Sequence, residues 1–163
     1  MLIKTKVALI GAMAVAVTAS GTAQAATVSA DAKVTIVAAV TIAQNDGLDF
    51  GVVASSATPG SVTLPTASNT RTCSAGLTCV GTALRGRFTV TATSGNTVRI
   101  TVPTTATVTS GGNTMTIALA PSMTSFSATA VPQVFYVGGT LSVGANQAAG
   151  SYTGTYNVSA DYQ

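Results

Sequence analysis

The chain has 163 residues, of which 7% are charged, and its seven basic and four acidic residues give a formal net charge of +3. Histidine and glutamate are absent, which removes histidine-based acid–base chemistry, most zinc sites and paired-glutamate glycosidase sites. We therefore expect a protein that is not an enzyme and that holds no metal and no cofactor.

Residues 1–25 are organised like a secretory signal peptide. They begin with the basic residues Lys4 and Lys6, continue with the short apolar stretch VALIGAMAVAV (7–17), and end with AQA (23–25), which offers small residues for cleavage. The apolar stretch is too short to cross about 30 Å of bilayer as a helix, and no later run is long enough. We expect export through the periplasm to the cell surface, with a mature chain that begins at Ala26 and has no membrane span.

Removal of two lysines with the leader leaves five basic and four acidic residues, a net charge of +1 (5 − 4). Nucleic-acid binding requires a clustered basic face, so the sequence predicts no nucleic-acid partner.

Residues 27–42 (TVSADAKVTIVAAVTI) begin with strict alternation of polar and apolar side chains. Successive side chains of a strand point to opposite faces, so residues 27–35 predict an extended segment with one apolar face. That face consists of Val28, Ala30, Ala32 and Val34. Residues 36–42 are apolar on both parities, and the whole run exceeds the usual strand of about 5–6 residues.

Two interpretations of this run stay open. In the first, residues 27–35 are a strand donated to the sheet edge of another subunit, and residues 36–42 form the domain's own buried first strand. In the second, the whole run stays in its own domain and bends between two sheets.

Short alternating segments separated by turn signals follow along the rest of the chain, without a convincing amphipathic helix. The predicted strands are residues 47–53, 61–65, 84–93, 97–103, 114–120, 134–144 and 151–162. Predicted inward-facing residues on three of these strands are Leu84, Phe88, Val90, Ala92, Val98, Ile100, Val102, Phe135, Val137, Leu141 and Val143. This pattern predicts a single all-β domain, an antiparallel sandwich of residues 43–163, preceded by residues 26–42 as an extension or first strand.

Cys73 and Cys79 are the two cysteines of the chain, with Gly76 between them. In an exported protein without a competing thiol, this pair predicts a disulfide that closes a short loop. The loop is short, so the bond is worth only about 2 kcal/mol on entropic grounds. Two cysteines without histidine are too few ligands for a metal site.

Residues 45–49 (NDGLD) contain the Asn-Asp-Gly sequence that is typical of a tight turn. They are also faintly similar to part of a calcium loop, but the full spacing and the bidentate glutamate are missing. We interpret them as a turn between strands.

Arg85 and Arg87 lie on the polar face of one predicted strand, and Arg99 lies on the next. Solvated, outward-facing side chains are one interpretation. A small patch that contacts an anion or a glycan is the other.

The end of the chain carries a second strict alternation. One face holds Tyr152, Gly154, Tyr156, Val158, Ala160 and Tyr162, and the other face holds polar residues. Taken by itself, this pattern is that of an ordinary closing strand.

LDFG (residues 48–51), the C-terminal run VGGTLSVGANQAAGSYTGTYNVSADYQ (137–163) and the leader together resemble a family of secreted bacterial domains related to spore coat protein U. That group is similar to chaperone–usher pilins. Classical pilins end in an alternating strand with a penultimate aromatic residue and a glycine fourteen residues from the end, and Tyr162 and Gly150 occupy these positions here. The disulfide loop is not at a position that matches the classical pilin bridge.

The resemblance implies an incomplete immunoglobulin-like sandwich. A periplasmic chaperone would fill it first, and the N-terminal extension of the next subunit would replace the chaperone at an outer-membrane usher. The resemblance also implies a C-terminal assembly strand formed by Gly150, Tyr152, Tyr156, Val158, Ala160 and Tyr162.

We therefore predict a structural subunit of a surface fibre (a fimbria or pilus), built from copies of itself by donor-strand exchange and supporting adhesion or biofilm formation. The alternative is a monomeric secreted binding module for a surface glycan or matrix component, which would use Tyr136 or the arginine face.

Overall fold

The computed structural model describes residues 24–163, which contain twelve β-strands and no helix. Most of the predicted signal peptide lies outside the described residues. Residues 24–35 contain no strand and belong to a separate unit, while residues 36–163 form one compact domain. The prediction of an all-β chain is confirmed.

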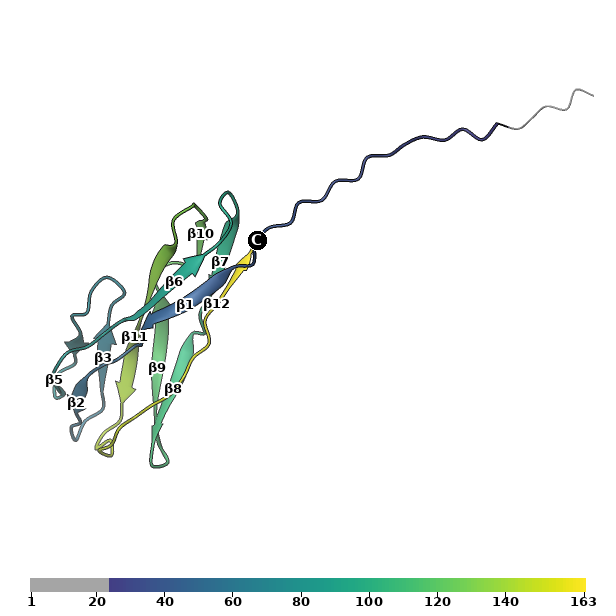
Figure 1. The fold of residues 1–163 in the computed structure, drawn as a ribbon. Helices are drawn as coiled ribbons and strands as arrows, with labels where there is room; N and C mark the ends of the chain where they lie inside the picture. Colours follow the sequence, from purple (N-terminus) through teal and green to yellow (C-terminus); the bar gives the residue numbers. More distant parts are fainter. Residues whose placement is uncertain (1–23) are drawn as a thin grey trace, which may run out of the picture. The chain divides into compact units, whose positions relative to one another are not determined.

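The larger sheet has seven strands, and every pairing in it is antiparallel. β11 is its longest strand and pairs with β6, β3 and β9, which lie around it in Figure 1. β1 pairs with β6, β4 with β3, and β8 with β9. The strands are β1 (Thr41–Asp46), β3 (Gly60–Leu64), β4 (Thr72–Cys73), β6 (Gly86–Thr91), β8 (Thr105–Ser110), β9 (Asn113–Pro121) and β11 (Gln133–Val143).

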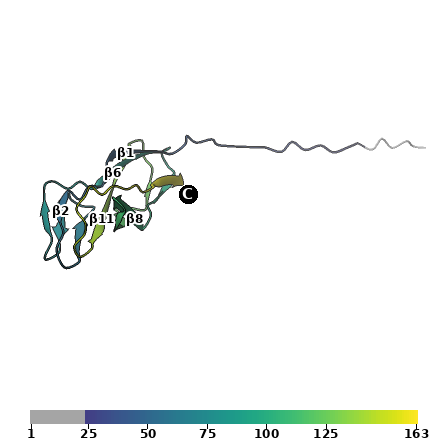
Figure 2. The ribbon, with the colours of Figure 1, turned by 90° about the horizontal axis from the view of Figure 1, so that it is seen from below.

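A smaller sheet has the order β10–β7–β12, and a two-stranded ribbon joins β2 to β5. Figure 2 shows these layers curling around the interior of the domain in a sandwich-like arrangement. The strands are β2 (Val52–Ala54), β5 (Thr78–Val80), β7 (Thr97–Thr101), β10 (Ser125–Ser127) and β12 (Ser159–Tyr162).

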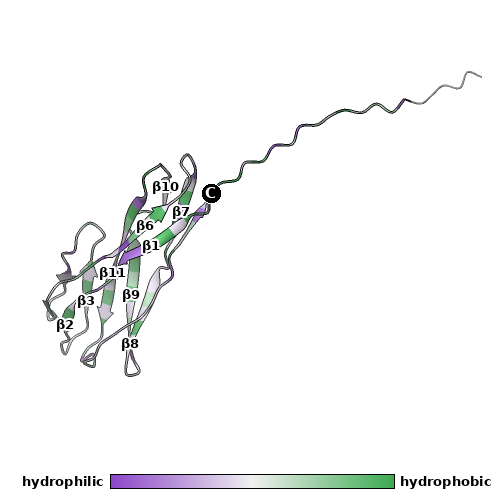
Figure 3. Ribbon diagram, in the orientation of Figure 1, coloured by the Kyte–Doolittle hydropathy of each residue, from purple (hydrophilic) through white to green (hydrophobic). Residues whose placement is uncertain are grey.

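The core forms because apolar residues alternate along each strand, so that one face of each sheet turns inward. Val98 and Ile100 of β7 are buried, as are Phe135 and Val137 of β11. The ring of Phe88 stacks on that of Phe135 with centroids 5.2 Å apart. Figure 3 shows apolar positions interspersed with polar ones along the strands of the larger sheet. The predicted inward face of these strands is confirmed, except that Leu84 is 43% exposed.

The first strand is shorter and starts later than the sequence predicts. β1 begins at Thr41, and the residues before it pair with no strand among the described residues. Ile36 is 89% exposed and Ile42 is 37% exposed, so residues 36–42 are not a buried home strand. An alternating apolar pattern favours an extended chain, but it does not say which strand the chain will pair with.

The tight turn predicted at residues 45–49 is wrong. The chain continues antiparallel to β6 through a register shift between Gln44 and Asp46, then forms an isolated bridge between Asp49 and Leu84. The extra residue is accommodated as a bulge, which bends the strand without reversing it. A true two-residue turn instead joins β8 to β9, where Gly111 and Gly112 both have positive φ (54° and 86°).

Candidate functional site

A groove runs along the domain between an early and a late segment of the chain. Its first rim is residues 47–55 and its second rim is residues 147–158, and four adjoining hollows that share lining residues make it continuous. We call this feature the seam groove. It lies entirely within the domain of residues 36–163.

The floor of the seam groove is apolar because the inward-facing residues of the larger sheet continue beneath it. Ile117 and Leu141 are buried there, and Val108 and Met115 are half-buried. Phe88 extends the apolar floor toward β1. The core thus reaches the surface along a line and is not covered by a strand.

Backbone groups on the second rim point into the seam groove without a partner. The N–H of Thr153 donates to the carbonyl oxygen of Thr109 on β8 (3.1 Å), and its C=O accepts from the N–H of Thr109 (2.8 Å). Successive residues of a strand direct these groups to opposite edges, so those of Tyr152 and Gly154 face the groove. Among the described residues, no strand pairs with them on that side. The second rim therefore has the properties of an unpaired sheet edge.

The first rim has the same property at Leu48. Asp49 exchanges both backbone hydrogen bonds with Leu84 (2.7 and 2.8 Å), which leaves those of Leu48 directed toward the groove. No backbone hydrogen bond in the described part of the chain joins residues 41–54 to residues 148–161. An extended segment placed between the two rims would find unpaired groups on both sides.

Hydrogen bonds connect the early and late segments beyond both ends of the seam groove. At one end, the hydroxyl of Tyr162 donates to the carbonyl oxygen of Ala38 and accepts from the N–H of Thr93, each at 2.8 Å. At the other end, the N–H of Asn146 donates to the carbonyl oxygen of Ser56 at 2.7 Å. The seam is therefore open along its middle and held at both ends.

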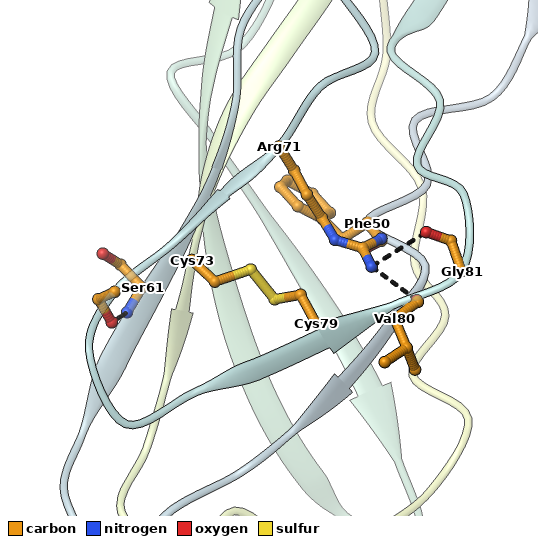
Figure 4. Close-up of a disulfide and its surroundings, with 8 residues drawn as sticks. Phe50, Ser61, Arg71, Cys73, Cys79, Val80 and Gly81 are labelled. Carbon is orange, nitrogen blue, oxygen red and sulfur yellow. Dashed lines mark hydrogen bonds between the residues drawn. A yellow bond between two sulfur atoms is a disulfide. The ribbon is translucent and has the colours of Figure 1, made fainter.

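The LDFG motif, residues 48–51, lies within the first rim. The side chain of Asp49 accepts a hydrogen bond from the N–H of Gly51 (2.7 Å), and Phe50 is buried beneath it. Gly51 has a φ of 67°, a conformation that favours glycine, and the guanidinium of Arg71 occupies the place of a side chain there. Arg71 donates to the carbonyl oxygens of Phe50 and Val80 (2.6 Å each) and of Gly81 (3.2 Å) (Figure 4).

The disulfide between Cys73 and Cys79, which the sequence predicts, is present (Figure 4). Cys73 lies on β4, which pairs with β3 of the larger sheet, and Cys79 lies on β5, which pairs with β2. Val52 and Val53 of β2 line the seam groove. The bond therefore attaches part of the first rim to the larger sheet.

The predicted C-terminal alternation matches the exposure of the side chains. Except for the exposed Gly154, this face is half-buried and the intervening polar residues are exposed, although only β12 and the bridge at Thr153 are regular pairings. The half-buried residues are Tyr152, Tyr156, Val158, Ala160 and Tyr162.

Two glycines bring the second rim close to β8. A Cβ atom on Gly154 would overlap the backbone carbonyl of Thr107, whereas one on Gly150 would overlap only the side chain of Ser110, mainly its hydroxyl. The pilin-like position, Gly150, is thus the less constrained of the two.

The hydroxyl of Tyr156 is buried and has no hydrogen-bond partner among the described residues. Burial raises the pKa of this hydroxyl above its ordinary value of 10.0, because the ionised form would lose its hydration. Tyr156 lines the middle of the seam groove and packs edge-on against Phe88.

The predicted donor residues lie outside the domain that contains the groove. Val28 is 92% exposed and Val34 is 82% exposed, and Ala30 and Ala32 between them are also exposed. We call residues 27–35 the extension.

The three arginines do not form one patch on neighbouring strands, because β6 and β7 belong to different sheets. Nη1 of Arg87 lies 3.9 Å from Oδ2 of Asp46. Arg99 on β7 is opposite Asp161 on β12 in the strand register. The guanidinium of Arg85 covers the ring of Tyr136 at 3.6 Å from its centroid.

Within residues 24–163 no cluster of three or more potential metal-binding side chains occurs. The same residues include no helix with the length and apolarity to cross a membrane.

The segment from Val40 to Tyr162 contains both rims, the floor, the disulfide loop and the LDFG motif. Residues 40–162 match a family described as a domain of unknown function, DUF4402. The chain belongs to this family. Neither the curated proteins nor the solved structures contain a significant match. The DUF4402 match includes the seam groove and excludes the extension.

Sequence reasoning missed several residues that shape the groove of this DUF4402 domain. Arg71 is a single arginine in a polar loop, and no sequence motif indicates that it donates hydrogen bonds to three carbonyl oxygens. The link between Ser56 and Asn146 joins positions 90 residues apart and leaves no local signal.

Proposed function

We propose that the protein is the structural subunit of a surface fibre, in which the extension of one subunit fills the seam groove of the next. The observation that carries the proposal is the groove itself, an apolar floor between two rims whose backbone groups lack partners. Strand addition supplies main-chain hydrogen bonds on both sides and pockets for alternate side chains.

The extension has the pattern that such a groove requires. Its apolar face carries Val28, Ala30, Ala32 and Val34, and its other face carries Thr, Ser, Asp and Lys. Burying each valine is worth about 1.5–3 kcal/mol. A slip by one residue would turn Asp31 and Lys33 toward the floor, so the register is strongly specified.

The likeness to relatives of spore coat protein U and to chaperone–usher pilins supports the same route. A leader for export, an open groove and an alternating C-terminal segment fit a subunit that a periplasmic chaperone protects and an outer-membrane usher delivers. The resulting fibre would lie at the cell surface and support adhesion or biofilm formation.

A glycan-binding monomer is less well supported. A sugar would stack on the exposed face of an aromatic ring, but the guanidinium of Arg85 occupies one face of Tyr136. The separation of Arg99 from Arg85 and Arg87 also removes the arginine patch that this alternative needs.

Assembly of the mature chain tests the proposal. We expect the wild-type chain to form polymers by light scattering and electron microscopy, and deletion of residues 26–33 to leave monomers. Val34→Asp places a charge on the apolar face and should abolish polymers. Thr35→Asp, the matched control on the other face, should assemble. Full-length fibres from the deletion variant would show that the extension is not the connector.

A further inference from the structure

The hydroxyl of Tyr162 holds the chain just before β1. It donates to the carbonyl oxygen of Ala38, three residues before β1 begins at Thr41, and it accepts from the N–H of Thr93. We propose that this clamp disfavours entry of the extension into the seam groove of its own subunit, so that the preferred occupant is a second copy of the chain. This inference rests on the function proposed above.

Self-insertion would require the chain to reverse direction just before β1. The extension would have to fold back along the free edge of β1 as the other arm of a β-hairpin, with its turn within residues 36–40. Short hairpin loops favour glycine, asparagine or aspartate, because most of them need a positive φ. Residues 36–40 are Ile-Val-Ala-Ala-Val and contain none of these.

The clamp acts on the segment that would have to turn. Ala38 lies at the centre of residues 36–40, and its carbonyl oxygen already accepts a hydrogen bond from the hydroxyl of Tyr162. Tyr162 is itself held in place because its strand, β12, pairs with β7. A hairpin turn there would have to break this hydrogen bond and impose an unfavourable conformation on β-branched and alanine residues. A second subunit meets neither obstacle, because its extension approaches the groove from outside.

The test converts the clamp into a hairpin turn in the full mature chain. Ala38→Asn with Ala39→Gly supplies the preferred two-residue turn, and Tyr162→Phe removes the hydroxyl but keeps the ring. We expect the triple variant to become a monomer whose extension resists protease, with at least a tenfold loss of polymer. Tyr162→Phe alone should raise the monomer share by up to about fivefold, the worth of the hydrogen bond to Ala38 that holds the segment before β1. Tyr136→Phe, which removes a hydroxyl outside the groove, should change nothing.

Adding Val34→Asp to the triple variant separates this inference from the proposed function. If the extension occupies its own groove, the added charge should make residues 27–35 protease-sensitive again while the protein stays monomeric. A triple variant that polymerises like the wild type would overturn the clamp and leave the proposed function standing. A wild-type chain that stays monomeric, with a protease-sensitive extension, would overturn both.

Discussion

The guanidinium of Arg71 occupies the space that a side chain on Gly51 would need. This contact joins the disulfide loop to the first rim of the seam groove, since Arg71 also binds the carbonyl oxygen of the neighbouring Phe50. The LDFG motif and a polar loop that carries no motif thereby fix the position of the rim together.

Gly51→Ala should therefore lower the free energy of unfolding by about 1–3 kcal/mol, because φ is positive and the new Cβ displaces the Arg71 side chain. Urea denaturation of the Val34→Asp monomer as host would measure the loss. Arg71→Ala should partly relieve it, since one of the two overlapping groups disappears while the carbonyl of Thr82 remains. Strictly additive effects of the two substitutions would contradict the interlocked arrangement.

Gly154→Ala and Gly150→Ala form a matched pair on the second rim. The first should cost about 1–3 kcal/mol, because its Cβ overlaps the backbone of β8, which cannot move without disturbing the sheet. The second should cost less than about 1 kcal/mol, because the hydroxyl of Ser110 can rotate away and its Cβ, at 3.2 Å, needs to move only slightly. Thermal unfolding of both variants in the same monomeric host gives the comparison. Equal losses would mean that the second rim does not lie close to β8 at Gly154.

The alternation in the sequence predicted which residues face the core wherever a strand is long and carries large apolar residues. Val98 and Ile100 on β7, and Phe135 and Val137 on β11, are buried as their parity predicts. Strands β4, β5 and β10 were not predicted, because two or three residues are too few to show the two-residue alternation of a strand. These strands are held instead by pairings with distant segments and, for β4 and β5, by the disulfide. β8 was missed because Ala106 and Val108 alternate with threonines and give a weak contrast.

The seam groove is harder to predict than the strands that surround it. Its rims lie about 100 residues apart in sequence. The groove exists because these two segments do not pair with each other, and no residue pattern in a sequence is specific for the absence of pairing. The alternation of the extension, by contrast, was evident from the sequence. That pattern reports an apolar face but does not identify the surface that covers it.

At pH 8, Tyr156→Phe should raise the free energy of unfolding by between zero and about 1 kcal/mol, because it removes a buried hydroxyl without a partner. The difference should grow with pH. Burial raises the pKa of Tyr156 above 10.0 in the folded state, so the unfolded chain releases its proton first as the pH rises. The wild-type free energy of unfolding therefore keeps its full value with respect to this group below pH 10, and it falls as the pH rises through the folded-state pKa.

Urea titrations at pH 8 and pH 10.5 would measure this dependence, with Tyr136→Phe as the control. The Tyr156→Phe variant should lose less stability between the two pH values than the wild type. A variant that is clearly destabilised at pH 8 would show that the hydroxyl has a partner.

The polarity of the proposed fibre leads to a mixing experiment. Val34→Asp subunits should accept an extension but not donate one. Met115→Asp subunits should donate but not accept, because the new charge lies on the half-buried floor of the seam groove. Thr116→Asp, on the exposed outer face of the same strand, is the matched control and should polymerise like the wild type.

Each of the two disabled variants should be monomeric by itself, and an equimolar mixture refolded together should form a one-to-one dimer that grows no further. Growth stops at two because the dimer has an extension that cannot insert and a groove that cannot accept. Light scattering gives the mass, and circular dichroism verifies that both variants are folded. Val108→Asp, at a neighbouring floor position, provides a second acceptor-deficient subunit with the same expected result. Polymers longer than two in the mixture, or no dimer from two folded variants, would exclude the extension and the seam groove as the two halves of the joint.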